Sequence, residues 1–366
     1  MEKSRILIGL VTALPVEWAA LQLMIEDAVP VDVDGDPSLY LHGTMPSRVP
    51  GRLHHVIAVR QVIDGNRSAA VVSTRLASSF PNLRHLVMCG IAGGVPSEGH
   101  DVRIGDVVSS TEGIIDYDHV RSDGGGDRLR RSLEGLSKVI LDADKSLETK
   151  DKLGRANWSQ ILDRPGLPPS FRRSSQAPAV HRGAIGSADR LLRNAVLRDR
   201  LGSRYGILAV EMEGSGIAVG SDLNGLYWYV VRGIADLADG AKNDLFHPSA
   251  SLAAAAYVRS LVGELPPPPG AAEAPGNGFG VIVSALTPLL SNEQNRWTIL
   301  RRLPERIRTQ VPSRDTARVQ AVALADTCER FPGGGQSLLD AVALVAGDDP
   351  DFPKFAEAMR RHWRGA

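Results

Sequence analysis

The chain has 366 residues, of which 43% are apolar and 23% are charged, so it is long enough for two folded domains. Lysine plus arginine (42) balance aspartate plus glutamate (42), which argues against a general attraction to nucleic acid or to an anionic membrane. The two cysteines, Cys89 and Cys328, are too few for a disulfide framework or a thiolate metal site. They predict small buried side chains in a cytoplasmic protein.

The first segment is predicted to be a buried strand followed by a helix. The apolar run at 6–14 follows Lys3 and Arg5, as in a signal peptide, but it continues into Pro15 and Glu17 and then into a helical pattern. A cleaved leader is therefore disfavoured. No segment reaches the roughly 20 apolar residues that a membrane-spanning helix requires.

Up to residue 263, short apolar runs alternate with helical segments. Helices are expected after Asn66 and over 251–262. This alternation predicts an α/β domain with a largely buried sheet. Residues 121–180 are polar, and we expect them to form a helical insertion at the rim of the functional site. The runs that predict strands are 5–11, 54–62, 85–91, 105–110, 205–213 and 226–236.

A domain boundary is predicted at 264–280, which reads ELPPPPGAAEAPGNGFG and is expected to be a semi-stiff linker. It separates a domain at 1–263 from a second domain at 281–366. In the second domain apolar residues recur at helical spacing, as in Leu324 and Cys328, and glycine-rich segments interrupt them. These patterns predict a small all-α bundle.

Four segments lie where predicted strands end, which is where ligands bind α/β sheets. They are TALPVEW (12–18), CGIAGGV (89–95), AVEMEGSGIA (209–218) and RGIADLADG (232–240). In this order they resemble the motifs of the methylthioadenosine/S-adenosylhomocysteine nucleosidases and the purine nucleoside phosphorylases, over residues 5–263. The resemblance implies a three-layer α/β fold with a central mixed sheet. It also implies cleavage of the N-glycosidic bond of a purine nucleoside or nucleotide.

The resemblance implies roles for three carboxylates. Asp236 would protonate the purine as it leaves, and Glu17 would activate the attacking water as a general base. Glu213 would bind the ribose hydroxyls and stabilise the positive charge that develops on the sugar. Each position also has a structural interpretation. Asp236 can cap a helix, Glu213 can lie in a first helical turn, and Glu17 can be exposed on a new helix.

The resemblance places further residues against the substrate. Met212 would pack under the ribose, and Glu211 is assigned to substrate binding although it can also serve only the helix dipole. The nucleosidases usually have serine where this chain has Ile91 and Ala235, and often phenylalanine where it has Leu191. These departures leave the 5′ substituent open. The remaining predicted binding residues are Ala92 and Gly93, where glycine permits close backbone approach.

Water is the favoured nucleophile. The purine phosphorylases carry an arginine in the first loop and another beside the middle glycine motif, and this chain has none at either place. Arg60, His181, Arg182 and Lys242 lie near the matching loops and could meet a 5′-phosphate chain, although surface solvation is the favoured interpretation. No metal or cofactor is expected, because no cluster of His, Cys or Asp has ligand spacing.

Residues 280–366 resemble the effector-associated domains of bacterial conflict systems, through SALTPLLSNEQNRWTILRRLP and ALADTCERFPGGGQSLLDAVALV. This resemblance implies a protein partner. Together the two resemblances predict a cytoplasmic, homo-oligomeric purine nucleosidase that is recruited as an effector in antiphage defence, with no nucleic-acid or membrane partner. A phosphorylase, a housekeeping methylthioadenosine nucleosidase and a nucleotide-binding sensor without turnover are the alternatives. Retention of both an acid and a base argues against the sensor.

Overall fold

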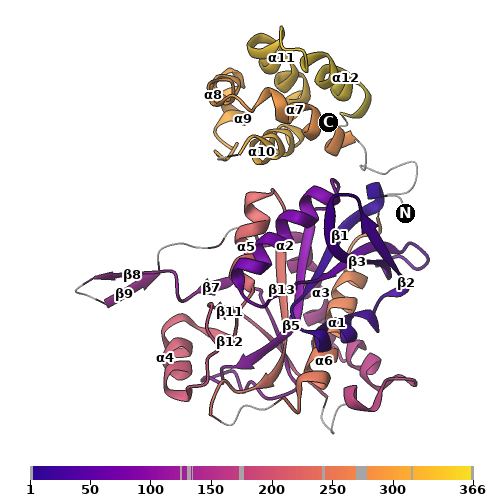
Figure 1. Ribbon diagram of the computed structural model, residues 1–366, viewed down its shortest axis with the longest axis vertical. Coiled ribbons are helices and arrows are strands. Elements are labelled where there is room, and N and C mark those ends of the chain that lie inside the picture. Colours follow the sequence, from indigo (N-terminus) through magenta and orange to yellow (C-terminus); the bar gives the residue numbers. More distant parts are fainter. Residues whose placement is uncertain are drawn as a thin grey trace. The chain divides into compact units, whose positions relative to one another are not determined.

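The structure is a computed structural model, and its described residues form two compact units (Figure 1). The first unit comprises residues 6–222 and 226–268, and the helices from Gly278 to His362 make up most of the second. The structure describes residues 3–123, 126–129, 133, 135–172, 177–240, 244–268, 278–314 and 316–363.

The first unit is built on a mixed sheet of eleven described strands. Its centre has the order β13-β5-β1-β4 and is entirely parallel. The central strands are β1 (Ile6–Thr12), β4 (His54–Arg60), β5 (His85–Gly94) and β13 (Tyr227–Asp236). They are nearly continuous apolar runs because both of their faces are buried, so the strands predicted from these runs are confirmed.

Further strands extend the centre on both sides. β3 and β2 continue antiparallel beyond β4, and β6 pairs antiparallel with β13. β12 pairs antiparallel with the end of β5 and parallel with β11, which in turn pairs with β7. The bounds of these strands are β2 (Glu26–Val33), β3 (Asp36–Met45), β6 (Val107–Ser109), β7 (Ile114–Asp116), β10 (Val180–Arg182), β11 (Ala184–Ser187) and β12 (Ile207–Glu211).

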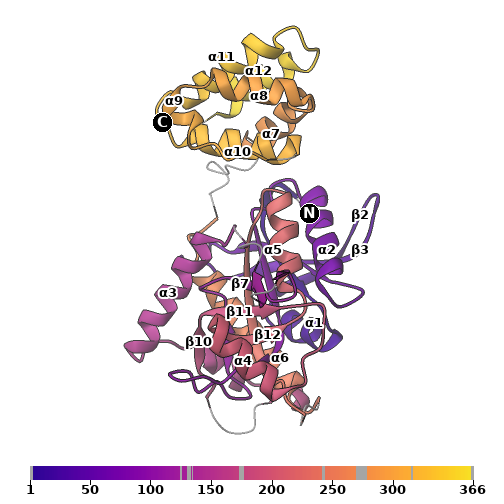
Figure 2. The same ribbon diagram turned by 90° about the vertical axis from the view of Figure 1, so that its left-hand side faces the viewer.

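Helices cover both faces of the sheet (Figures 1 and 2). Successive residues of a strand point to opposite faces, so Val87 and Tyr229 belong to one apolar cluster, while Met88 and Val230 belong to the other. The first cluster includes α1 (Pro15–Gln22), α3 (Lys138–Lys152) and α6 (His247–Glu264), and the second includes α2 (Asn66–Ser79) and α5 (Gly214–Leu223). The predicted three-layer α/β fold with a central mixed sheet is therefore confirmed.

The segment 121–180 differs from the predicted helical insertion. It begins with a separate hairpin of β8 (Val120–Asp123) and β9 (Gly126–Leu129). Helix α3 then packs into the first cluster through Ile140, Ala143 and Leu147, which recur at helical spacing. The short helices η2 (Trp158–Asp163) and η3 (Pro169–Phe171) follow, and α4 (Ala195–Tyr205) lies beyond the segment. Much of the segment thus belongs to the core of the unit.

The second unit is helical, as predicted. Apolar side chains from its helices, among them Leu286, Leu324, Cys328, Leu338 and Phe355, form its own buried cluster. Its helices are α7 (Gly278–Leu289), α8 (Glu293–Arg302), α9 (Glu305–Arg308), α10 (Ala317–Glu329), α11 (Gly334–Ala346) and α12 (Phe352–His362). Of the linker predicted at 264–280, residues 269–277 lie outside the described residues.

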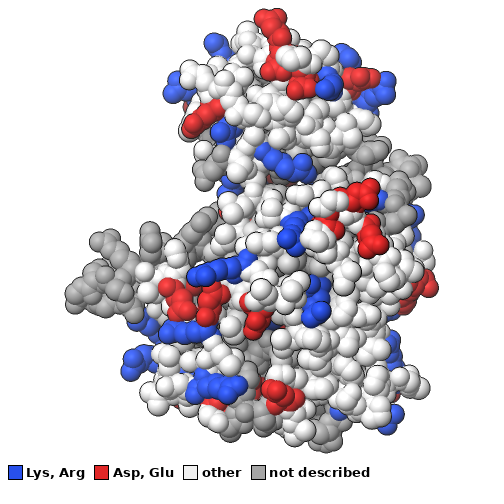
Figure 3. Space-filling view, in the orientation of Figure 1, with Lys and Arg blue, Asp and Glu red and all other residues white. Residues whose placement is uncertain are grey.

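Three expectations drawn from the composition of the whole chain can be compared with the structure. Cys89 and Cys328 are both free and buried, as predicted. Acidic and basic side chains are interspersed on the face shown in Figure 3, in keeping with the balanced composition. No described helix is both long enough and apolar enough to cross a membrane.

Close packing of β13 on α6 predicts that Gly233→Ala destabilises the first unit. A Cβ at Gly233 would overlap the backbone carbonyl of Ala250, which cannot move without shifting α6. We expect the free energy of unfolding to fall by about 1–3 kcal/mol, measured by urea denaturation. Gly240→Ala is the matched control, because nothing lies within 4 Å of a Cβ there. Equal unfolding midpoints for the two variants would contradict this prediction.

Candidate active site

A cavity of about 250 Å³ opens where β1, β5, β12 and β13 end. All four motifs singled out from the sequence contribute to its wall. The residues that line it are Ala13, Leu14, Glu17, Asp64, Ile91, Ala92, Gly93, Tyr117, Arg190, Leu191, Leu192, Arg193, Val210, Glu211, Met212, Glu213, Asp236, Asp244 and His247. None of the described residues from 121 to 180 is among them, so the described part of this segment does not form the expected rim.

Glu17 is held in place by backbone groups. Its Oε2 accepts hydrogen bonds from the N–H groups of Ala13 and Leu14, each at 2.8 Å. Its Oε1 accepts a third, also at 2.8 Å, from the N–H of Ile91 on β5. The side chain folds back over the first turn of α1 and is only 2% exposed, so the carboxylate is fixed between two strand ends.

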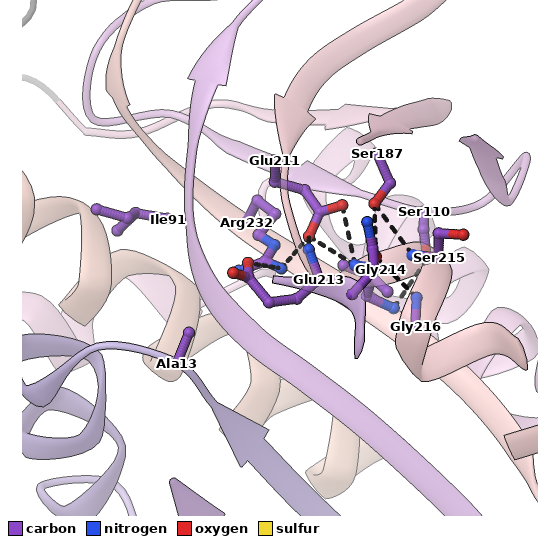
Figure 4. A network of polar contacts seen from close by, with 12 residues as sticks. Ala13, Ile91, Ser110, Ser187, Glu211, Glu213, Gly214, Ser215, Gly216 and Arg232 are labelled. Carbon is purple, nitrogen blue, oxygen red and sulfur yellow. Dashed lines mark hydrogen bonds and ion pairs between the residues drawn. The ribbon is translucent and has the colours of Figure 1, made fainter. Parts of the chain in front are cut away.

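Arg232 lies behind the cavity, fully buried on β13. Its Nη2 donates to Glu211 and to Glu213, the latter at 3.2 Å (Figure 4). Its Nη1 is 3.9 Å from Glu17 Oε1. Burial alone would lower the pKa of Arg232, but the three surrounding glutamates raise it above its usual value. Within the described part of the chain, its Nε and Nη1 have no hydrogen-bond acceptor.

Glu211 and Glu213 differ in their surroundings. Glu211 accepts hydrogen bonds from the N–H groups of Glu213 and Gly214, so it caps the start of α5 (Figure 4). Glu213 accepts one bond from the N–H of Gly65, at 3.0 Å, and lines the cavity. Burial raises the pKa of Glu213 to about 7, with Arg232 opposing the shift and Glu211 adding to it.

Asp236 reaches the cavity at the end of β13. Its Oδ1 accepts a hydrogen bond of 2.7 Å from the N–H of Ala238, whose φ of 50° is unusual for a residue other than glycine. Gly93 on the neighbouring strand permits this arrangement, because a Cβ there would lie 2.8 Å from the Ala238 side chain and 3.1 Å from Asp236 Oδ1. The close approach therefore has a steric requirement for glycine.

Nine of the ten residues assigned to the site from the sequence line this one cavity. The exception is Ala235, which is buried in β13 and does not line it. The pairing of β13 with β5 is irregular between Ile234 and Asp236, so regular alternation of side chains does not predict where Ala235 points. Contact of Ala235 with substrate stays a prediction.

Several lining residues were not assigned from the sequence. Tyr117, Asp64 and His247 belong to segments without a recognisable motif, so no local signal identifies them. Arg232 could have been found, because an arginine inside the apolar run YVVRGIA must be buried with a charged partner.

Of the four basic side chains considered for a 5′-phosphate chain, the three in the described part of the chain do not line the cavity. His181 hydrogen-bonds to Asp106 at 2.9 Å, and Arg182 donates to Asp144 at 2.5 Å, so neither is surface-solvated as favoured. Arg60 is exposed and does not line the cavity. Lys242 lies outside the described residues.

Comparisons with known proteins cover both units. Residues 8–263 match the model of the phosphorylase superfamily, and residues 285–360 match that of effector-associated domain 2. The ATP nucleosidase Cap17 of Escherichia coli is 31% identical over 265 residues, which cover 67% of this chain and 49% of that protein. The chain spans less than half the length of several such curated relatives.

Two further proteins are similar to the first unit over nearly their whole length. The 5′-methylthioadenosine/S-adenosylhomocysteine nucleosidase of Mycobacterium tuberculosis is 26% identical over 270 residues, covering 71% of this chain and 96% of that protein. The structure of futalosine hydrolase from Helicobacter pylori shares the fold, with a TM-score of 0.54 and 19% identity, over 72% of this chain and 99% of that one. The chain belongs to the phosphorylase superfamily.

Proposed function

We propose that the first unit is a purine nucleosidase, which hydrolyses the bond between a purine and its ribose. The observation that supports this most directly is the single cavity that holds Glu17, Glu213 and Asp236 together. Cleavage leaves positive charge on the sugar and negative charge on the purine. A cavity lined by carboxylates stabilises the first, and a proton from an acid neutralises the second.

Asp236 is proposed as the acid that protonates the leaving purine. Its carboxyl group is buried, oriented by the N–H of Ala238, and lines the cavity. Glu213 is proposed to bind the ribose hydroxyls and to stabilise the sugar cation. It accepts hydrogen bonds from Gly65 and Arg232. Glu211, in contrast, caps α5.

Glu17 is proposed as the base that takes a proton from the attacking water. Three backbone N–H groups fix its carboxylate at the wall of the cavity. A water molecule bound on the cavity side would donate a hydrogen bond to Glu17 and keep a lone pair for attack on the sugar. One of its protons would pass to Glu17 and its oxygen would bond to the sugar carbon, while the purine departs with the proton from Asp236.

The charges around Glu17 favour water over phosphate as the nucleophile. A phosphate there would lie beside Glu17, Glu211 and Glu213, and the arginine behind them is already paired with two of these glutamates. Arg190, which lines the cavity, is also paired, with its Nη2 2.9 Å from Asp118. Arg193 also lines the cavity but is exposed, and the side chains around Glu17 are mostly anionic, so an anionic nucleophile at Glu17 would be repelled.

We propose a purine nucleoside or nucleotide as substrate, with adenine nucleotides such as ATP first among them, because Cap17 bears the name ATP nucleosidase. The match to effector-associated domain 2 supports an effector of antiphage defence that a protein partner recruits through the second unit. The two free cysteines support a cytoplasmic location. We also propose that the protein is a homo-oligomer, which sedimentation would test.

The similarity to a methylthioadenosine nucleosidase over 96% of its length supports a second candidate, a housekeeping enzyme. A substrate panel separates the two. Pure protein is incubated with adenosine, methylthioadenosine, guanosine, AMP and ATP, with and without phosphate, and free base is measured by chromatography. Preference for ATP supports the effector, and strong preference for methylthioadenosine supports the housekeeping enzyme. No base release from any compound, with or without partner, would overturn the proposed function.

We expect Asp236→Asn to lose base release by about 100-fold or more, because an amide cannot donate the proton that the purine needs. The substitution should have little effect on 4-nitrophenyl riboside, whose leaving group departs without a proton. The control is Asp239→Asn, three residues along, which does not line the cavity. If both substrates lose rate equally in Asp236→Asn, Asp236 is not the acid.

We expect Glu17→Gln to slow hydrolysis by about 100-fold or more, since the amide cannot accept a proton from water. In wild-type protein, base release should proceed without added phosphate and leave a reducing sugar that carries no new phosphate, as read by mass spectrometry. Formation of ribose 1-phosphate that depends on added phosphate would instead identify a phosphorylase.

The raised pKa of Glu213 predicts that kcat/KM rises with pH through about 7. Below that pH the carboxyl group is protonated and neutral, so it stabilises the sugar cation poorly. In Glu213→Gln this step of the pH profile should disappear and the overall rate should fall. The same step in wild-type and variant protein would show that another group controls it.

A further inference from the structure

Two backbone N–H groups at the start of α5 are bound by side chains from distant segments. Oγ of Ser187, at the end of β11, accepts a hydrogen bond of 3.1 Å from the N–H of Ser215 (Figure 4). Oδ1 of Asn66, the first residue of α2, accepts one of 2.8 Å from the N–H of Gly216. The Ser187 hydroxyl also donates to Asn66 Oδ1 at 3.1 Å, so the two caps are joined. The first N–H groups of a helix have no partner within it, so these contacts fix where α5 begins.

Helices α2 and α5 are in close contact at the same place. A Cβ on Gly216 would lie 1.9 Å from the backbone oxygen of Asn66, so the contact requires glycine at this position. The N–H of Asn66 donates to Asp189 Oδ1 at 2.8 Å, which ties the start of α2 to the segment after β11 as well. Asn66 is therefore held by contacts with α5, with β11 and with Asp189, yet it does not line the cavity.

The neighbours of these contacts hold Glu213. Gly65, which precedes Asn66, donates its N–H to Glu213 Oε1 at 3.0 Å. Glu213 in turn precedes α5, three residues before Gly216. The hydrogen bonds from Gly65 to Glu213 and from Gly216 to Asn66 therefore close one small ring between the start of α2 and the start of α5. A shift of α2 that lengthens one of these bonds also strains the other.

We propose that Asn66 is a positioning residue for Glu213. By binding the N–H of Gly216, it fixes the start of α2 against α5, so that the N–H of Gly65 stays on the Glu213 carboxylate. The carboxylate is then held where the ribose hydroxyls would bind, although Asn66 itself does not touch the substrate. This inference rests on the proposed function, since it concerns the orientation of the proposed ribose-binding residue.

Loss of the Asn66 contact should change the charge state of Glu213. A hydrogen bond to a carboxylate stabilises its charged form, so the N–H of Gly65 lowers the pKa of Glu213 against the larger effect of burial. Without that bond the pKa should rise further, and the carboxyl group should become charged only at higher pH. A substitution in α2 leaves the other charged groups near Glu213 unchanged. They are Arg232 on β13, Glu211 on β12, Glu17 on α1, and Asp64 and Asp236 on the cavity wall.

The test is Asn66→Ala in the full chain, with two kinetic readouts. The step in kcat/KM at about pH 7 should move to higher pH by about half a unit or more, because Glu213 loses a hydrogen bond. The preference for adenosine over 2′,3′-dideoxyadenosine, or for ATP over its dideoxy counterpart, should fall about fivefold or more. A purely structural loss lowers the amount of active protein, so it would slow both compounds equally and leave the pH profile in place.

Three further variants make the test specific. Asn66→Asp keeps an oxygen acceptor in the same place, so it should retain the sugar preference at about pH 9, where Glu213 is charged. Thr74→Ala is the matched control, because Thr74 is exposed later on the same helix, and it should behave like wild-type protein. If Asn66→Ala does not fold, Ser187→Ala should shift both readouts in the same direction, because it removes the hydroxyl that donates to Asn66.

An unchanged pH midpoint and sugar preference in the folded variant would overturn the inference, as would equal loss with both sugars. Calorimetry with formycin A, a C-nucleoside that cannot release its base, separates this inference from the proposed function. If no compound loses its base but Asn66→Ala binds formycin A about fivefold more weakly than wild-type protein, only the proposed function is contradicted. If wild-type protein releases base and Asn66→Ala behaves identically, only the inference is contradicted.

Discussion

The geometry of the cavity depends on one buried arginine. Arg232 has no exposed surface, and a charge in such a position is tolerated only with opposite charges and hydrogen bonds around it. It contacts Glu211 and Glu213 and approaches Glu17, so three carboxylates from two distant segments converge on one guanidinium. The converse also holds, because three carboxylates this close would repel one another without the arginine. The cluster is therefore stable only as a whole, which fixes the carboxylates relative to β13.

Backbone packing makes room for this cluster. A Cβ on Gly90 would overlap both the guanidinium of Arg232 and the carboxylate of Glu17, so glycine is required where β5 passes the ion cluster. Gly93 has the same relation to Asp236 on the other side of the cavity. The glycine motif that first suggests a ligand-binding loop thus also has a structural purpose: it lets the charged side chains of neighbouring strands approach the sheet.

Prediction from the sequence succeeded where a residue's position follows from its own segment. The strands β1, β5, β12 and β13 are apolar runs that each end in a motif, so Glu17, Glu213 and Asp236 could be placed at one edge of the sheet. Prediction failed where a side chain has its hydrogen-bond or ion-pair partner far away in the sequence. His181 and Arg182 look like surface charges until Asp106 and Asp144 are brought beside them by β6 and α3. The strands β2 and β3 were missed because their exposed faces carry polar residues and dilute the apolar pattern.

The two units differ in where their charged side chains lie. The first unit has its charges buried around a cavity, where fixed carboxylates can stabilise a transient cation. The second has its conspicuous charges exposed, on helices whose opposite faces already complete a core. Exposed charges contribute little to folding stability in such positions, so the stability of this unit comes from its apolar cluster. Recruitment by a protein partner through this unit, as proposed above, would raise the local concentration of the nucleosidase attached to it.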